Sequence, residues 1–265
     1  MKTESYGSRQ DPEENTSIPH CTLKMFPEET LHCVEWAKDL FGTYFSLNPQ
    51  NFNKLKNADI SEVGFNQYAE TKNIKKAIKM AEQFPKDFNG CIAKARMKFQ
   101  KLYYNDILQL IHVYPLDKMT KEGRLFWSLP KRPPKEQVFD QANSIHSNFV
   151  AAYACLTANV YGIKIPYDAP RSEEAKLEMA KLASTVEVKE FKPNDAKARE
   201  IESQVDKEQK NESEDEEEPL PEEMEEQKEE IKMIDTTVIK KTSISPAHLE
   251  NYFSETVHND DIPFL

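Results

Sequence analysis

Glycine is scarce in this sequence, and the glycine patterns of phosphate-binding loops are absent. The chain has 265 residues and only 6 glycines, and it contains neither G-x-G-x-x-G nor G-x-x-x-x-G-K-[ST]. Both patterns need glycine because the backbone approaches a phosphate closely there. We therefore expect no nucleotide site of either kind, and no bound cofactor, within this chain.

Long hydrophobic runs are also missing. No stretch approaches the ~18 consecutive apolar residues that a membrane-spanning helix requires. The first five residues, Met-Lys-Thr-Glu-Ser, lack the apolar core of a signal peptide. These absences predict a soluble protein that is neither exported nor bound to a membrane.

The sequence has no concentrated excess of basic residues of the kind that a nucleic-acid-binding surface needs. The net charge is −11, and residues 211–230 hold 12 acidic residues against one lysine, so 34 acidic and 34 basic residues remain elsewhere. Nucleic-acid binding through bulk charge is therefore not expected. The acidic run is too repulsive and too poor in apolar groups to fold alone. It predicts a solvated, disordered linker, with a docking segment for a basic partner as the alternative.

The four cysteines form no paired motif. They stand at positions 21, 33, 91 and 155 without any C-x-x-C pair, so neither a zinc site, nor another metal site, nor a disulfide framework is indicated. Cys33, Cys91 and Cys155 fall in helical runs beside apolar residues, which predicts buried thiols. Cys21 lies in a non-helical segment with Lys24 nearby, just before a predicted helix start, where positive potential favours a thiolate. On these local features alone, an unreactive surface cysteine remains open.

Helical periodicity dominates the rest of the chain. Apolar residues at helical spacing predict helices over residues 27–45, 74–81, 87–111 and 148–161, with Asp87 as an N-cap, a stop before Pro115, and Gly162 in a left-handed position after the last one. Two short alternating runs, residues 186–191 and 237–239, predict minor β structure. The fold class is therefore mainly α, with minor β and the acidic linker.

An aromatic pair precedes a proline-rich basic stretch between the predicted helices. Phe126 and Trp127 come just before residues 128–134, whose prolines prevent continuous helix. Such a pair is expected to anchor a loop on the core. Lys131 and Arg132 are either solvated or contacts for an acidic partner.

Several separated motifs resemble the catalytic cysteine region of ubiquitin-activating enzymes. They are residues 3–12 (TESYGSRQDP), 18–27 (IPHCTLKMFP), 32–38 (HCVEWAK), 110–115 (LIHVYP), 126–128 (FWS), 130–132 (PKR) and 190–193 (EFKP). They occur in order over residues 3–193, which is more specific than any single motif. The resemblance implies that Cys21 is the nucleophile, with Thr22 and Lys24 as possible supporting residues.

The resemblance also implies an activity and partners. In that family, ATP and magnesium bind a separate adenylation domain of the full-length enzyme, which converts the C-terminus of ubiquitin into an adenylate. The cysteine then forms a thioester, and a ubiquitin-conjugating enzyme receives the ubiquitin. Implied partners are thus ubiquitin, conjugating enzymes and the adenylation domain of the same polypeptide, in the cytoplasm and nucleus. An isolated fragment is expected to be inactive alone.

The resemblance divides the chain into four parts. Residues 1–18 are expected to connect from the adenylation region, and 19–193 to form the helical catalytic cysteine domain. Residues 194–232 are the expected linker, and 233–265 a segment returning toward the adenylation region, so a larger protein is expected to continue beyond the end. Two alternatives stay open: an activating enzyme for another ubiquitin-like modifier, and a non-catalytic helical interaction module.

Overall fold

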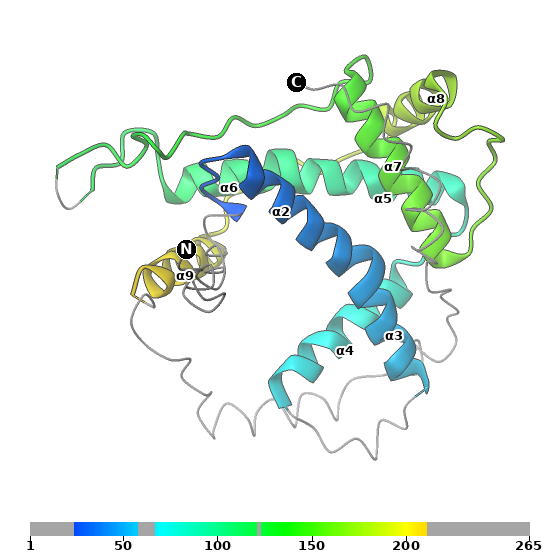
Figure 1. Ribbon diagram of the computed structural model, residues 1–265, viewed down its shortest axis with the longest axis horizontal. Coiled ribbons are helices and arrows are strands. Elements are labelled where there is room, and N and C mark those ends of the chain that lie inside the picture. The colour runs from blue at the N-terminus through cyan, green and yellow to red at the C-terminus, as the bar shows by residue number, and fades with distance from the viewer. Residues whose placement is uncertain (1–23, 58–66, 121–122, 211–265) are drawn as a thin grey trace, which may run out of the picture.

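The computed structural model describes residues 24–57, 67–120 and 123–210. Within these ranges the chain is almost entirely helical (Figure 1). The only β pairing there is one isolated antiparallel bridge between Met119 and Leu125. The mainly α prediction is confirmed, but the strand predicted over residues 186–191 is wrong, because that segment is extended without a pairing partner among the described residues. The other predicted strand, 237–239, lies outside them.

Two long helical rods organise the molecule. The first joins α2 (Thr30–Phe41), the π-helical turn η2 (Gly42–Leu47) and α3 (Asn48–Asn57). The second joins α5 (Phe88–Gln100), the π-helical turn η3 (Lys101–Asn105) and α6 (Asp106–Val113). The backbone stays helical through both π turns, so each rod is continuous and runs on without a loop, as Figure 1 shows.

The remaining helices pack around these rods. They are α4 (Gln67–Glu82), α7 (Ser144–Tyr161), α8 (Glu173–Ser184) and α9 (Asp195–Lys210). The sequence predicted α4, α5, α6 and α7 but not α3, α8 or α9. The first predicted helix begins at Thr30 rather than at Pro27. Since α9 occupies residues 195–210, the described part of the expected 194–232 linker is helical.

Local signals explain where these helices begin and end. The Asp87 carboxylate accepts a hydrogen bond from the Gly90 amide at 2.8 Å, as an N-cap should. Gly162 ends α7 with φ +64°, a left-handed conformation that glycine adopts without a Cβ penalty. The second rod ends at Val113, two residues before Pro115. These three predictions are confirmed.

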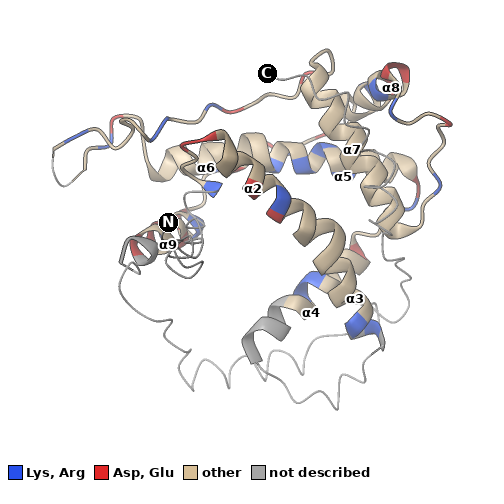
Figure 2. Cartoon of the chain, in the orientation of Figure 1, with Lys and Arg blue, Asp and Glu red and all other residues tan. Residues whose placement is uncertain are grey.

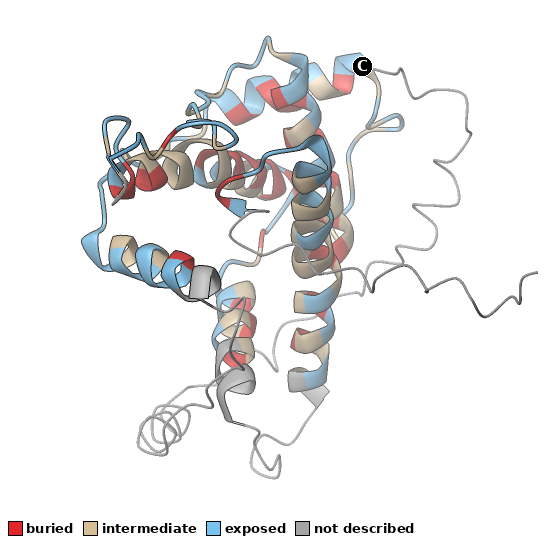
Figure 3. Ribbon diagram, turned by 60° about the vertical axis from the view of Figure 1, so that its left-hand side comes forward, coloured by how far each residue is buried: buried red, intermediate tan, exposed pale blue. Residues whose placement is uncertain are grey.

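Small side chains let the central helices approach closely. Where α5, α7 and α8 meet, the buried cluster includes six alanines and two cysteines, filled out by larger apolar residues such as Val150 and Met179. Figure 3 shows that buried residues lie on the faces where helices meet, while the outer faces are exposed. A second cluster joins the first rod to α4 and to the end of α7, around Phe45 and Phe52. A third cluster, described next, lies beside α6 and α9.

Candidate functional site

The predicted nucleophile Cys21 and its neighbour Thr22 lie outside the described residues. Lys24 is the first residue that the structure describes, and it stands three positions after Cys21. Three residues of chain span at most ~11 Å, so the Cα of Cys21 lies within that distance of the Cα of Lys24. Residues 24–26 are therefore the described part of the chain that comes nearest to Cys21 in sequence.

Met25 and Phe26 are buried in an aromatic anchor. The anchor consists of side chains from four separate segments, namely residues 25–26, the end of the second rod, residues 126–127 and α9. Its buried members are Met25, Phe26, Leu110, Val113, Tyr114, Trp127 and Val205. The ring of Phe26 lies 5.7 Å from that of Tyr114 and 5.6 Å from that of Phe126, both in edge-on geometry. Such pairs add to the stabilisation from buried area.

The aromatic pair of the sequence motif anchors its loop, as predicted. The Trp127 indole Nε1 donates a hydrogen bond of 2.7 Å to the Tyr114 carbonyl oxygen, so its polar group is satisfied inside the cluster. Phe126 stacks on Tyr114 with 4.3 Å between ring centroids. The ammonium of Lys131 lies 4.9 Å from the centroid of the Phe126 ring and 5.2 Å from that of Phe26. Lys131 is therefore engaged in cation–π contacts.

Helix α9 is fastened to α6 by polar side chains on one face of α6. The Gln109 amide nitrogen donates to the Asn194 carbonyl oxygen and the Asn194 backbone amide donates to Gln109 Oε1, each at 3.0 Å. One turn further, His112 Nε2 donates to Asp195 Oδ1 at 3.1 Å. Gln109 is buried, so these two bonds also satisfy a polar group that would otherwise be costly. We call this set of contacts, with Asp106 and Lys197, the α6–α9 clasp.

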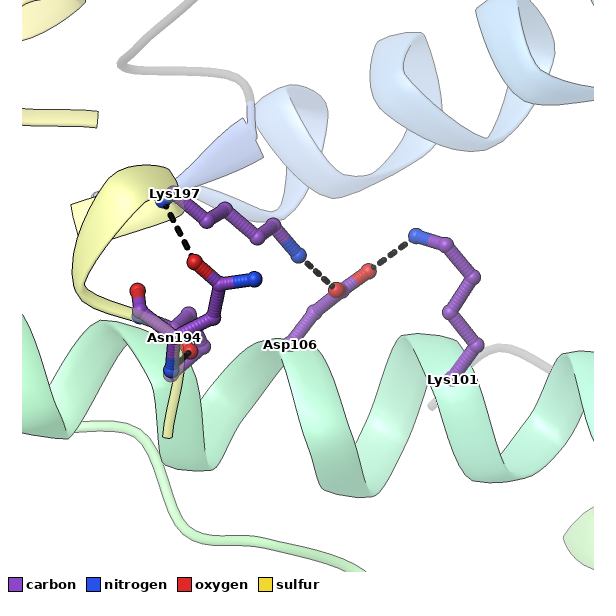
Figure 4. A network of polar contacts seen from close by, with 5 residues as sticks. Lys101, Asp106, Asn194 and Lys197 are labelled. Atoms are coloured by element: carbon purple, nitrogen blue, oxygen red, sulfur yellow. Dashed lines mark hydrogen bonds and ion pairs between the residues drawn. The ribbon is translucent and has the colours of Figure 1, made fainter. Parts of the chain in front are cut away.

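The third part of the clasp is an ion-pair cluster centred on Asp106 (Figure 4). Its carboxylate accepts hydrogen bonds from Lys101 Nζ at 2.7 Å and from Lys197 Nζ at 2.8 Å. Burial alone would raise the pKa of Asp106, but these two hydrogen bonds and the charges of the two lysines outweigh it and hold the pKa below its usual range. Asp106 is therefore ionised at neutral pH and bridges the second rod to α9.

Lys24 lies beside this cluster. Its residue surface is exposed, yet partial burial lowers the pKa of its ammonium, and the charges of Lys101 and Lys197 lower it further while Asp106 and Glu200 oppose them. Three lysines thus gather around one aspartate near the segment that carries Cys21. A positive potential of this kind favours a thiolate over a thiol and favours an anionic leaving group.

The other three cysteines differ in exposure. Cys91 and Cys155 are buried, as predicted, whereas Cys33 is exposed and its predicted burial is wrong. The reason is that α2 buries none of its residues among the described contacts. Burial raises the pKa of Cys91 to about 12 and raises that of Cys155. Neither buried thiol is therefore suited to act as a nucleophile.

Sequence reasoning missed α8, α9 and the clasp. The signals were present in part. Ser172 caps α8 by accepting a hydrogen bond from the Ala175 amide at 3.2 Å, and Asn194 caps α9 by accepting one from the Lys197 amide at 2.9 Å. Both residues are of the preferred N-cap type. The pairing of Gln109 with Asn194 joins residues 85 positions apart, so no local pattern could have indicated it.

No metal site is present in the ranges that the structure covers. No group of three or more His, Cys, Asp or Glu side chains gathers there in a way that could hold an ion. In the same ranges, no helix is both long and apolar enough to cross a membrane.

The fold and the anchor define a class of protein: a helical domain in which Met25 and Phe26, ahead of the first long helix, are buried in an aromatic cluster. The sequence profile of the family described as "Ubiquitin-activating enzyme, SCCH domain" matches residues 27–262. The chain therefore belongs to the ubiquitin-activating enzyme family, as the second catalytic cysteine half-domain.

Similar proteins support this assignment. "Ubiquitin-like modifier-activating enzyme 6" of Homo sapiens is 38% identical over 196 residues, covering 72% of this chain and 18% of that protein. "Ubiquitin-like modifier-activating enzyme 1" of Dictyostelium discoideum is 36% identical over 210 residues, covering 76% and 19%. "Ubiquitin-activating enzyme E1 1" of Candida albicans (strain WO-1) is 41% identical over 166 residues, covering 62% and 16%. The chain thus spans less than a fifth of the length of each of these relatives.

Proposed function

We propose that this chain is the thioester-forming module of a ubiquitin-activating enzyme and that Cys21 is its acyl acceptor. The observation that carries the proposal is the rigid attachment of residues 24–26. Met25 and Phe26 are buried in the aromatic anchor, while Lys24 stays at the surface beside the Asp106 cluster. A nucleophile that precedes such an anchor in sequence has a fixed point of attachment on its C-terminal side.

The reaction requires little from the domain beyond placement and charge. The Cys21 thiolate attacks the carbonyl carbon of the ubiquitin adenylate, a new S–C bond forms, and the C–O bond to AMP breaks with its electron pair leaving on AMP. Since AMP is a good leaving group, partial thiolate character and correct position are sufficient without a dedicated triad base. In this proposal Lys24 supplies positive charge that favours both the thiolate and the departing phosphate, and Thr22 is a polar supporting residue.

The proposed partners follow from the same reaction. Ubiquitin supplies the acyl group, the adenylation domain of the same polypeptide makes the adenylate with ATP and magnesium, and a conjugating enzyme takes over the thioester. The connector of residues 1–18 would carry Cys21 to the adenylate. We place the parent enzyme in the cytoplasm and nucleus, which imaging of a tagged full-length protein would test.

The decisive experiment is a non-reducing gel of the full-length parent enzyme with ubiquitin, ATP and magnesium, with and without dithiothreitol. We expect a thiol-sensitive adduct in the wild type that is lost, or becomes thiol-resistant, in Cys21→Ser. Cys33→Ser is the matched control, because Cys33 is an exposed thiol of α2 to which the proposal gives no role, and it should keep the adduct. A thiol-sensitive adduct that survives Cys21→Ser would contradict the assignment of Cys21.

The same gel distinguishes the two alternatives. An adduct with another ubiquitin-like modifier but not with ubiquitin would identify a different branch of the family. The presence of the motifs at residues 126–128 and 130–132 is our reason to favour ubiquitin, since both resemble that branch. The absence of any adduct, with folding intact, would indicate a non-catalytic interaction module.

A further inference from the structure

One side of the second rod carries a row of lysines, to which we give the name lysine face. Lys94, Lys98 and Lys101 follow one another at spacings of four and three residues, which places them on the same side of a continuous helix. Lys79, in the last turn of α4, is close enough for its charge to act on Lys98. In Figure 2, blue segments recur along α5 and appear again on α4.

The two central lysines lie against aromatic rings instead of acidic partners. Lys98 Nζ lies 3.5 Å from the centroid of the Tyr44 ring. Lys94 Nζ lies 4.9 Å from the centroid of the Tyr161 ring and donates to Tyr161 Oη at 3.4 Å. In the described part of the chain no carboxylate forms an ion pair with Lys94 or Lys98. Cation–π contacts neutralise an ammonium far less than a carboxylate does.

The electrostatics agree with this geometry. Partial burial lowers the pKa of Lys94 to about 8, and Cys91 opposes this, with no carboxylate contributing among the described residues. Partial burial also lowers the pKa of Lys98 to about 8, and the charges of Lys101, Lys79 and Lys94 add to the effect while Asp106 opposes it. An anion nearby would stabilise the charged form of these ammonium groups. Binding of carboxylates to the lysine face is therefore favourable.

The acidic groups near the lysine face are too few to balance it. Asp106 is already shared between Lys101 and Lys197, at 2.7 and 2.8 Å. Asp39 acts on Tyr44, but it forms no ion pair with the lysine face within the described ranges. The four lysines of this surface and Lys197 therefore have two aspartates nearby. Asp106 is already paired with two of these lysines, and among the described residues Asp39 is paired with none of them. The surface retains positive charge that has no partner in the part described.

The same chain holds a segment of opposite charge. Residues 211–230 contain 12 acidic residues and a single lysine, whereas the rest of the chain is balanced at 34 against 34. The segment begins directly after α9, and α9 itself begins at the clasp beside Asp106. Twenty extended residues reach roughly 66 Å, whereas the 13 residues of α5 are only ~20 Å long. The segment is therefore long enough to return from the end of α9 and follow the row.

We propose that the lysine face is the docking site for the chain's own acidic segment, residues 211–230. Covalent linkage makes the binding intramolecular, so the effective concentration of the segment is in the millimolar range and weak individual contacts suffice. The docked segment would cover the rod between η2 and α4. An acidic partner protein could then bind this surface only by displacing the segment.

The first test is zero-length cross-linking of the full chain with a water-soluble carbodiimide, followed by peptide mass spectrometry. The reagent activates a carboxyl group. A lysine amine then attacks the activated carboxyl carbon and displaces the activating group, which gives an amide. Lys101 to Asp106 and Lys197 to Asp106 serve as internal references, because both pairs lie within 2.8 Å. We expect cross-links from acidic residues of the segment to concentrate on Lys94, Lys98 and Lys101. Cross-links spread evenly over exposed control lysines such as Lys181 and Lys189 would overturn the proposal.

The second test separates docking from lysine reactivity. A fluorescent peptide of residues 211–230 is titrated onto a full-length chain in which all 12 acidic residues of the segment are replaced by Gln or Asn. We expect saturable binding that weakens at least tenfold between 50 and 300 mM NaCl and at least tenfold in K94Q/K98Q. The matched variant K181Q/K189Q, altered at two exposed sites, should bind within twofold of the parent. Equal loss in both variants, or no binding to the parent, would overturn the proposal.

Discussion

At the scale of single residues, the most consequential side chain is Phe26. It is 5% exposed and contacts the rings of Tyr114, Phe126 and Trp127. It stands only five residues beyond Cys21 in sequence, so the aromatic anchor is the described contact region closest to the proposed nucleophile along the chain. The sequence motif around Cys21 therefore carries both the proposed thiol and the apolar residues that attach it to the domain.

Exposure also separates the cysteines by reactivity, which gives the first prediction. In the native chain at pH 8, we expect iodoacetamide to alkylate Cys33 at least tenfold faster than Cys91 or Cys155. Cys33 is exposed, whereas burial of the other two raises their pKa values, to about 12 for Cys91. Peptide mass spectrometry over a time course measures this. In urea the rates should converge, and comparable rates in the native chain would contradict the burial of the two thiols.

The N-cap of α5 gives a second prediction. Asp87→Ala removes the hydrogen bond of 2.8 Å to the Gly90 amide and leaves that donor unsatisfied at the helix start. We expect the free energy of unfolding to fall by about 1 kcal/mol. Urea unfolding followed by circular dichroism measures the change. Asp87→Asn, which keeps an acceptor in place, should lose less than half as much, and an equal loss would indicate that capping is not the cause.

At the scale of elements, the α6–α9 clasp links two helices that are far apart in sequence. Asp106, Gln109 and His112 recur every three residues on α6 and contact residues 194–197. Val205 further along α9 is buried in the aromatic anchor. Helix α9 is thus held at its start by polar contacts and along its length by apolar ones, and it forms part of the wall around residues 25–26.

The clasp predicts a pH dependence. The folded pKa of Asp106 is depressed, so its stabilising contribution is present above its usual value of about 3.9 and is lost as pH falls through the lower folded pKa. We expect Asp106→Asn to cost roughly 1 kcal/mol at pH 7, a modest value because both lysines are partly exposed. The cost should be smaller at pH 2 than at pH 7.

Urea titrations of the wild type and the variant at both pH values measure this difference. Asp117→Asn is the matched control, because Asp117 is exposed and forms no ion pair with the described residues. It should change stability by less than ~0.5 kcal/mol at either pH. A cost of Asp106→Asn that stays constant with pH would show that the loss does not come from the carboxylate charge.

At the scale of the whole molecule, the alanine-rich contact between α5, α7 and α8 forms the largest buried cluster among the described residues. Met179 of α8 is fully buried there, with no exposed surface. Leu177, two residues earlier on the same helix, is 44% exposed. Substitutions at Met179 and Leu177 therefore test the effect of burial at two neighbouring positions of one helix.

We expect Met179→Ala to reduce the free energy of unfolding by about 2 to 5 kcal/mol, since it leaves a cavity in a close-packed core. Leu177→Ala should cost less than about 1 kcal/mol, because alanine is a good helix former and little buried area is lost. Chemical denaturation of the two variants measures both values. Similar costs for the two substitutions would mean that α8 is not packed as described.

Most of the helices could be predicted because their signals are local. Apolar spacing indicated α4, α5, α6 and α7, and the cap residues Asp87 and Gly162 marked boundaries that the structure confirms. Helices α3, α8 and α9 were missed because they are rich in polar and charged residues, and half of the apolar residues of α8 and α9 are alanine. Cys33 was misplaced because helical periodicity does not show whether a helix has a partner on that side.

The amino-acid sequence by itself determined the helical class, the chief boundaries and the family motifs around Cys21, because caps, periodicity and motifs act between residues a few positions apart. Only the tertiary structure decided which residues surround that segment. Phe26, Trp127 and Val205 meet in one cluster. Asp106 pairs with nearby Lys101 and also with Lys197, which lies 91 positions away in sequence. Such contacts depend on how complete helices pack, and packing is set by the shape and burial of whole faces rather than by any local pattern.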